Sequence, residues 1–185
     1  MSDGHRRQDR LETRAFSEPV PIETPRLTLR PMSLGDAEFV LRLFNEPSFI
    51  RYVGDKGIRT LEDAYSYIVT GPVESYGRHG YGLYVAQLKD PNETIGICGL
   101  LRREWLTDVD LGFAFLPEYW SRGYAFEAAA AVVAYARQAY GVSRIVAITS
   151  PDNAPSHRLL ERLGFRFERV VRAPAEEQDV TLFAL

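Results

Sequence analysis

The sequence predicts a mixed α/β fold, with a mostly antiparallel central sheet that contains one parallel pair of strands and is flanked by helices. Residues 81–88, 94–101 and 109–116 are three apolar segments separated by short polar connections. Connections this short require antiparallel neighbours. An Ala-rich segment, 125–140, then separates 109–116 from the β-branched segment 144–149. These last two strands must therefore run parallel, joined by a helical crossover.

The N-terminal part supplies a strand and two helices. Residues 24–30 alternate apolar and polar positions, as a half-buried strand does. A capping box over 33–36 opens a helix that we expect Pro47 to close, and a second box over 60–63 opens a helix that Gly71-Pro72 interrupts. Apolar residues recur at helical spacing in both segments: Ala37, Val40, Leu41 and Phe44 in the first, and Leu61, Ala64, Tyr65 and Ile68 in the second.

The C-terminal part predicts a second helix and a hairpin. Gly141 is suited to cap the crossover helix, and Gly164 to cap the helix that follows the parallel strand. Residues 165–171 and 179–185 then form a hairpin with 173–178 at its tip. We expect a single domain over 22–185, preceded by a mobile N-terminal arm over 1–21. The arm carries four arginines that suit either a solvated tail or a partner-binding segment: Arg6, Arg7, Arg10 and Arg14.

Composition excludes several classes of protein. A net charge of −3 argues against general nucleic-acid binding. The single cysteine, Cys98, excludes an intrachain disulfide and indicates a reducing compartment. No apolar run is long enough to span a membrane, and the N-terminus lacks the apolar core of a signal peptide, so we expect a cytoplasmic protein without membrane contact. The three histidines form no ligand spacing, and no metal is expected.

An anion site is predicted where the crossover helix begins. Pro117 ends the preceding strand, and Gly123 lies at the turn into the helix, where backbone N–H groups lack intrahelical partners. The partial positive charge of a helix N-terminus, together with Arg122, suits a phosphate or pyrophosphate. The motifs of a P-loop and of a dinucleotide-binding turn are both absent.

A second sequence motif indicates which phosphate-containing ligand binds. Gly123-x-Ala125 is followed by Asn153-x-x-Ser156-x-x-Leu159-Leu160-x-x-x-Gly164-Phe165. This pattern resembles the acetyl-CoA-binding core of the GNAT N-acetyltransferases, and with the upstream segments it resembles the ribosomal-protein N-terminal acetyltransferases of the RimJ/RimL type. The resemblance covers about residues 23–185. It implies a GNAT fold and transfer of an acetyl group from acetyl-CoA to a primary amine, by direct attack in a ternary complex.

The resemblance also implies which residues bind the cofactor. The pantetheine arm would lie in a gap between strands 109–116 and 144–149, and Asn153 would help to hold the cofactor. Trp120 replaces a Gln or Arg that many relatives have, so one polar contact is in doubt. Arg158 and Arg162 either meet the outer phosphates or are solvated. The remaining implied contacts are Phe113, Phe115 and Leu116 along the pantetheine, and Arg122, Gly123, Tyr124 and Ala125 at the pyrophosphate.

Two residues are candidates for acid–base chemistry. Asp110 lies where this branch often has Glu, so it is the expected base, working through a water; the alternative is a strand-end aspartate paired to an arginine. Glu104 and Glu118 are weaker candidates. Many relatives place a tyrosine acid at the position of Leu160, so Ser156 is the expected proton donor to the thiolate. Asn153 and Ser156 also suit a simple capping role at the helix start.

The acceptor is less determined than the cofactor. Phe49, Tyr52 and Tyr65, with Arg51 and Tyr76 nearby, either contact the acceptor or pack at the edge of the core. The branch suggests a protein or peptide N-terminal amine. The alternatives are a small amine, such as an antibiotic, polyamine or amino acid, or a non-catalytic module that binds acyl-CoA. We expect a monomer or homodimer.

Overall fold

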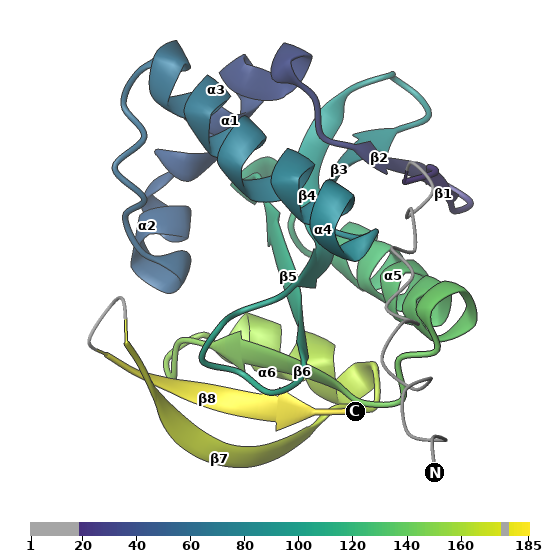
Figure 1. The fold of residues 1–185 in the computed structure, drawn as a ribbon, viewed down its shortest axis with the longest axis vertical. Helices are drawn as coiled ribbons and strands as arrows, with labels where there is room; N and C mark the ends of the chain where they lie inside the picture. The colour runs from purple at the N-terminus through teal and green to yellow at the C-terminus, as the bar shows by residue number, and fades with distance from the viewer. Residues whose placement is uncertain (1–18, 175–177) are drawn as a thin grey trace, which may run out of the picture.

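The computed structural model describes residues 19–174 and 178–185 (Figure 1). Most of the predicted N-terminal arm, residues 1–18, and part of the predicted hairpin tip lie outside this range. Within it, one sheet holds eight strands in the order β1-β2-β3-β4-β5-β6-β8-β7. Their bounds are Ile22–Glu23 (β1), Leu27–Pro31 (β2), Leu83–Leu88 (β3), Thr94–Leu101 (β4), Val109–Phe115 (β5), Ile145–Thr149 (β6), Arg166–Ala173 (β7) and Gln178–Ala184 (β8).

The topology confirms the predicted fold class. Each neighbouring pair is antiparallel except β5 and β6, which run parallel through the helix α5, Tyr124–Tyr140. The β5/β6 contact is short, because only Val109 pairs with Ile145 and Asp110 with Val146. Beyond these pairs the two strands separate, while β6 stays paired with β8. A slot therefore opens in the sheet beside the C-terminal half of β5.

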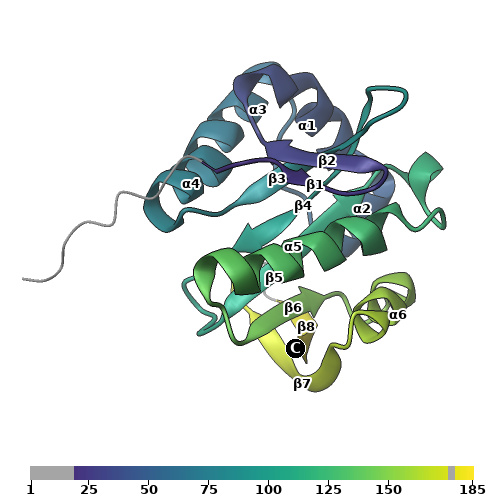
Figure 2. The same ribbon diagram turned by 90° about the vertical axis from the view of Figure 1, so that its right-hand side faces the viewer.

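The strands have a buried side chain on each face, so the sheet carries two apolar cores. On β3, Tyr84 and Ala86 belong to a core with α5, whereas Leu83 and Val85 face the opposite way. That second core holds side chains of α1 (Ala37–Phe44), α2 (Pro47–Val53) and α3 (Leu61–Ile68). Figure 2 shows strands β2 to β4 between α5 on one side and α3 and α4 (Glu74–His79) on the other. The helix α6, Ala154–Arg162, adds Leu160 to the α5 side.

The helical region differs from the prediction at two prolines. Helix α1 ends at Phe44, and Pro47 opens a further helix, α2, instead of only closing the first. Proline suits this position because the first turn of a helix needs no donor there. Gly71-Pro72 does not interrupt α3: a π-helical segment, Val69–Val73, contains Pro72 and continues directly into α4. The wider π turn accommodates the missing N–H of the proline.

Candidate active site

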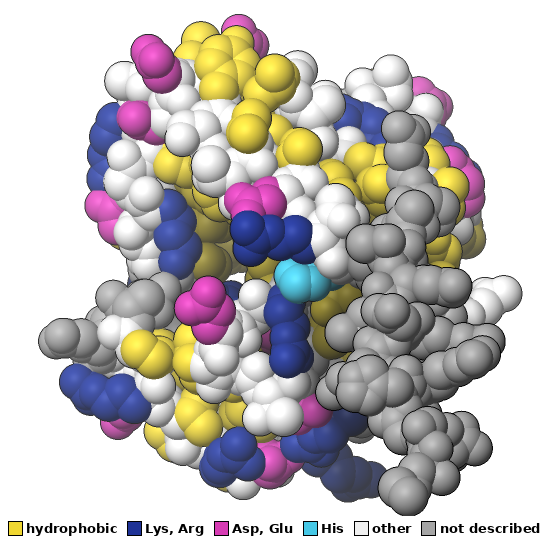
Figure 3. Space-filling model, viewed as in Figure 1, with side chains coloured by type: hydrophobic (Ala, Val, Ile, Leu, Met, Phe, Trp, Pro, Cys, Tyr) yellow, Lys and Arg dark blue, Asp and Glu magenta, His cyan; other side chains and the backbone are white. Residues whose placement is uncertain are grey.

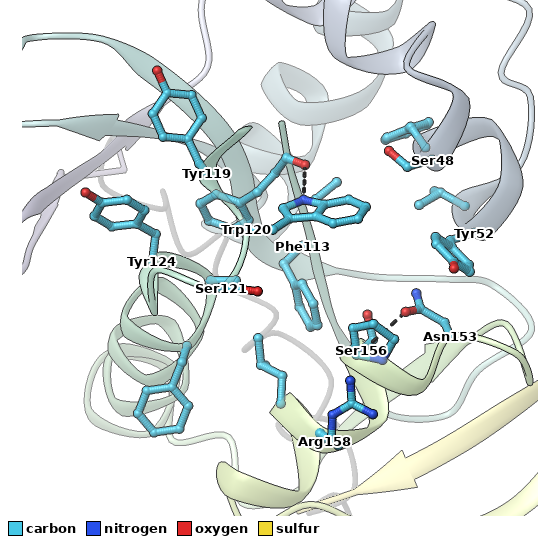
Figure 4. Close-up of a pocket in the computed structure, with 18 of the residues that line it drawn as sticks. Ser48, Tyr52, Phe113, Tyr119, Trp120, Ser121, Tyr124, Asn153, Ser156 and Arg158 are labelled. Carbon is cyan, nitrogen blue, oxygen red and sulfur yellow. Dashed lines mark hydrogen bonds between the residues drawn. The ribbon is translucent and has the colours of Figure 1, made fainter. Parts of the chain in front are cut away.

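A cavity of about 480 Å³ lies between the end of β5, the turn before α5, helix α2 and the start of α6. Figure 4 shows its walls: Phe113 and Trp120 lie between Ser121 on the α5 side and Ser156 and Asn153 on the α6 side, with Ser48 and Tyr52 above. The cavity therefore occupies the slot that the separation of β5 and β6 opens.

The turn before α5 has the geometry of an anion site. Gly123 adopts φ 83° and Ser121 φ 60°, both in the left-handed region. Helix α5 follows for 17 residues, so its first N–H groups are without intrahelical acceptors and carry the positive end of the helix dipole. The sequence predicts that the pyrophosphate contacts Gly123, Tyr124 and Ala125, and all three residues line the cavity. The Arg122 side chain does not; it lies over the Tyr119 ring, 5.7 Å from its centroid.

The face of β5 brings two of the three predicted pantetheine contacts to the cavity. Phe113 and Phe115 line it, whereas Leu116 is fully buried in the core with α1 to α3 and does not reach it. Leu116 turns away because successive side chains of an extended strand alternate between its two faces: Phe113 and Phe115 pack on the α5 side, whereas Leu116 packs on the other. Trp120 closes the cavity at this end, and its indole N–H donates to the Phe115 carbonyl at 2.7 Å.

The start of α6 forms the opposite wall. Asn153 is the N-cap, and its side-chain oxygen accepts the Ser156 N–H at 3.2 Å. The Ser156 hydroxyl makes no hydrogen bond with any described residue and faces the cavity. Arg158 and Arg162 also line it, and Arg162 lies 4.4 Å from the centroid of the Phe126 ring on α5. Two cations, unpaired backbone N–H groups and aromatic walls suit the phosphates and the apolar arm of a coenzyme A thioester.

Asp110 lies outside this lining. Its side chain is 1% exposed on β5, where it accepts Arg103 Nε at 2.6 Å and the Ile148 N–H at 3.3 Å. Burial raises the pKa of the Asp110 carboxyl, against the opposing effects of Arg103 and the Ile148 N–H. The pairing with arginine matches the structural alternative to the base. Glu118 is exposed and paired with Arg42 at 2.5 Å.

The predicted acceptor contacts divide into two groups. Phe49 and Tyr52, both on α2, line the cavity. Tyr65 lies on α3, 44% exposed and outside the lining, and Tyr76 is buried with its hydroxyl donating to the Leu83 carbonyl. Arg51 points to the far wall, where it pairs with Asp152 at 2.9 Å. Sequence reasoning missed Ser48 and Val53, which also line the cavity, because α2 was not predicted; Pro47 was the available signal.

Other features of the described residues carry no chemistry of this kind. Cys98 is fully buried, and burial raises the pKa of its thiol. No group of three or more His, Cys, Asp or Glu side chains in residues 19–174 and 178–185 is placed to hold a metal ion. Over the same residues, no helix combines the length and apolarity needed to cross a bilayer.

A second, smaller hollow of about 280 Å³ lies between α3, α4 and β4. Arg78, His79 and Arg102 line it. Burial lowers the pKa of His79, and the two arginines add to that effect. Figure 3 views this side of the molecule, where apolar side chains lie inside a hollow and charged side chains lie on its rim.

Comparison with known proteins agrees with this geometry. The model of the acetyltransferase (GNAT) domain matches residues 26–166. An uncharacterized N-acetyltransferase of Bacillus subtilis, YoaA, is 34% identical over 153 residues, which cover 82% of this chain and 85% of the relative. The crystal structure of an acetyltransferase from Agrobacterium tumefaciens superposes with a TM-score of 0.77 at 25% identity, covering 92% of this chain and 95% of that one.

A further solved structure shares the fold at lower identity and contains the cofactor. RimL, a ribosomal alpha-N-protein acetyltransferase in complex with coenzyme A, superposes with a TM-score of 0.77 at 16% identity, covering 89% of this chain and 97% of that one. The chain therefore belongs to the GNAT family and is an acetyl-CoA-dependent N-acetyltransferase.

Proposed function

We propose that the acceptor is the N-terminal α-amine of a protein or peptide, as in the RimJ/RimL branch. One observation carries the proposal: the described residues that line the cavity include no Asp, Glu or His. Their ionisable side chains are arginines and tyrosines, which do not take a proton from an ammonium group near neutral pH. The acceptor must therefore arrive largely as the free amine, or lose its proton to a group outside the lining.

The ionisation of amines then decides between acceptors. A peptide α-amine has a pKa of about 7.7 to 8.0 and a lysine side chain about 10.4. At pH 7.5 roughly a third of the former, but only about one in a thousand of the latter, is free base. A site without a base at the cavity favours the α-amine by this difference alone.

The proposed roles follow from where the side chains lie. Bound acetyl-CoA supplies the activated acyl group. The N–H groups of the Gly123 turn, with Arg158 and Arg162, would hold its phosphates, and Phe113 and Phe115 would flank its pantetheine arm. The amine nitrogen bonds to the thioester carbon as the C–S bond breaks, and Ser156 would give the leaving thiolate its proton. The attacking nitrogen loses a proton as the amide forms, and Asp110 would receive this proton through a water, once its ion pair with Arg103 opens.

The test is a panel of acceptors assayed by thiol release from acetyl-CoA at several pH values. It compares a lysine-free peptide with a free N-terminus, the same peptide N-blocked and carrying an internal lysine, spermidine, and an aminoglycoside. We expect kcat/KM at pH 7.5 to be at least about tenfold higher for the free N-terminus, with the gap narrowing as the pH approaches 10. Turnover of spermidine or the aminoglycoside without turnover of the peptide would overturn the proposal.

A further inference from the structure

The turn that carries the anion site is held from outside its own segment. Arg26, just before β2, extends across the start of α5, where its Nε donates to Glu127 Oε2 at 2.7 Å and its Nη1 to the Arg122 carbonyl at 3.0 Å. Its guanidinium carbon lies 4.4 Å from the centroid of the Tyr124 ring. One side chain thus contacts the turn, the first helical residue and the first turn of α5.

Glu127 anchors this arrangement. Its Oε1 accepts the Thr24 hydroxyl at 2.7 Å and the backbone N–H of Arg26 at 2.8 Å. The Glu127 side chain is 16% exposed and that of Arg26 47%. Because the carboxylate is largely buried and accepts from three donors, it fixes the N-terminal hairpin to α5 and holds the guanidinium in one orientation.

The contact with the Arg122 carbonyl bears directly on the backbone of the anion site. Arg122 lies between two residues with positive φ, Ser121 at 60° and Gly123 at 83°. A serine in this region is strained and persists only where its surroundings hold it. Arg26 Nη1 restrains the peptide plane between Arg122 and Gly123, and this plane also sets the direction of the Gly123 N–H. The Nη2 atom, which makes no hydrogen bond with any described residue, would lie 3.3 Å from a Cβ at Gly123.

We propose that Arg26 is a positioning residue for cofactor binding, which holds the Ser121 to Gly123 turn in the conformation that receives the phosphates of coenzyme A. The inference rests on the proposed placement of those phosphates at this turn. It predicts that Arg26 matters for the phosphate-bearing part of the cofactor and not for the pantetheine arm, which would lie against β5.

The experiment compares two acyl donors that differ in that part. Acetyl-CoA carries the phosphates, whereas S-acetylpantetheine ends before them. In Arg26→Ala we expect KM for acetyl-CoA, and Kd for coenzyme A by titration calorimetry, to rise on the order of tenfold, the scale of one lost charge-assisted hydrogen bond. The kcat/KM for S-acetylpantetheine should change by less than about twofold, because that donor makes no contact with the turn.

Conservative variants separate positioning from charge. Arg26→Lys keeps the positive charge, but a lysine ammonium cannot reach both Glu127 and the Arg122 carbonyl as the planar guanidinium does. The variant should therefore restore little of the affinity. Glu127→Gln should weaken coenzyme A by a smaller factor, since its amide can still accept two of the three donors. Arg42→Ala is the matched control: it breaks an exposed ion pair to Glu118, in the same connection between β5 and α5, without touching the turn.

Four results would overturn the inference. Unchanged coenzyme A affinity in Arg26→Ala would show that the turn holds its shape alone. Equal losses with both donors, or full recovery in Arg26→Lys, would show a general structural or purely electrostatic effect. If the wild-type protein used both donors equally well, the phosphates would not be bound at this turn. Both the assignment of the phosphate site and the inference would then be wrong. A change of the preferred amine acceptor would leave the inference intact.

Discussion

At the scale of single residues, the Asp110 side chain stabilises the place where β5 and β6 separate. Its backbone makes the last β5/β6 pair, with Val146, and its carboxylate accepts the N–H of Ile148. Beyond the last pair, β6 N–H groups that face β5 no longer have a strand carbonyl opposite them. The Asp110 side chain supplies an acceptor there, and it helps to hold the strands apart where the slot begins.

Asp110→Asn tests the base without removing this acceptor. We expect kcat to fall by roughly 10² if the carboxylate takes the amine proton, with Kd for coenzyme A nearly unchanged. The free energy of unfolding should change by less than about 2 kcal/mol, since a carboxylate with a raised pKa gains little from its charge in the folded state.

Asp110→Leu is the matched variant, because it also removes the acceptor for the Ile148 N–H. It should lower both the melting temperature and the affinity for coenzyme A. Full activity in Asp110→Asn would leave the residue with its structural role alone, and the proton would then leave directly to water.

At the scale of elements, the sequence predicted those whose ends carry strong local signals. Strand β4 lies at residues 94–101 as expected, and α5 ends at Tyr140 with Gly141, φ 63°, as its cap. Helix α2 was missed because a proline both ends and begins helices, and only tertiary packing of Phe49 shows which applies. The sequence offered pairing with an arginine as one of two roles for Asp110, but it could not show that the partner is Arg103, since this depends on how the loop before β5 folds back.

The ion pair of Arg51 and Asp152 joins two elements across the cavity. Arg51 lies on α2 and Asp152 just before the α6 cap, and their side chains are 64% and 55% exposed. An exposed pair is weak and can open readily. In Arg51→Ala we expect the association and dissociation rates of coenzyme A to rise together by roughly two- to fivefold, with no measurable change in melting temperature.

Stopped-flow binding measures these rates. High salt screens this pair in the wild-type protein, and in both proteins it screens the attraction between coenzyme A and the arginines of the cavity. The ratio of the Arg51→Ala rates to the wild-type rates should therefore fall toward one as the salt concentration rises. Exchanging the charges, with Arg51→Asp and Asp152→Arg together, should restore the original rates. Unchanged rates in Arg51→Ala would mean that coenzyme A enters the cavity by another route.

At the scale of the whole molecule, two carboxylates with little exposure hold the N-terminal segment: Asp36 lies between β2 and α1, and Glu127 lies on α5. Asp36, 5% exposed, pairs with Arg30 at 2.6 Å, and Glu127 pairs with Arg26. Burial alone would raise both pKa values, but Arg30 and Ser33 hold the pKa of Asp36 below its usual range, and Thr24 and Arg26 do the same for Glu127. Each carboxylate therefore favours the folded state when it is charged.

The sign of the pH dependence follows. Lowered folded pKa values give stability that is complete above the unfolded values of about 4 and is lost as the pH falls through the folded ones. The melting temperature should drop steeply below about pH 4.5. Asp36→Asn should lower it at pH 7 and flatten the acid limb, whereas Glu62→Gln, at an exposed position on α3, should leave the profile unchanged.

The short contact between β5 and β6 has a mechanical consequence. Two residue pairs join the backbones there, yet the apolar core runs on without a break, since Ile145, Ala147 and Phe183 pack in one cluster with Leu111 and Phe115. Hydrogen bonds fix a strand register, whereas apolar contact is non-directional and tolerates small sliding. The sheet is therefore stiff along its antiparallel parts and compliant at this joint. The width of the slot can adjust to the thickness of what enters it while each backbone hydrogen bond stays intact.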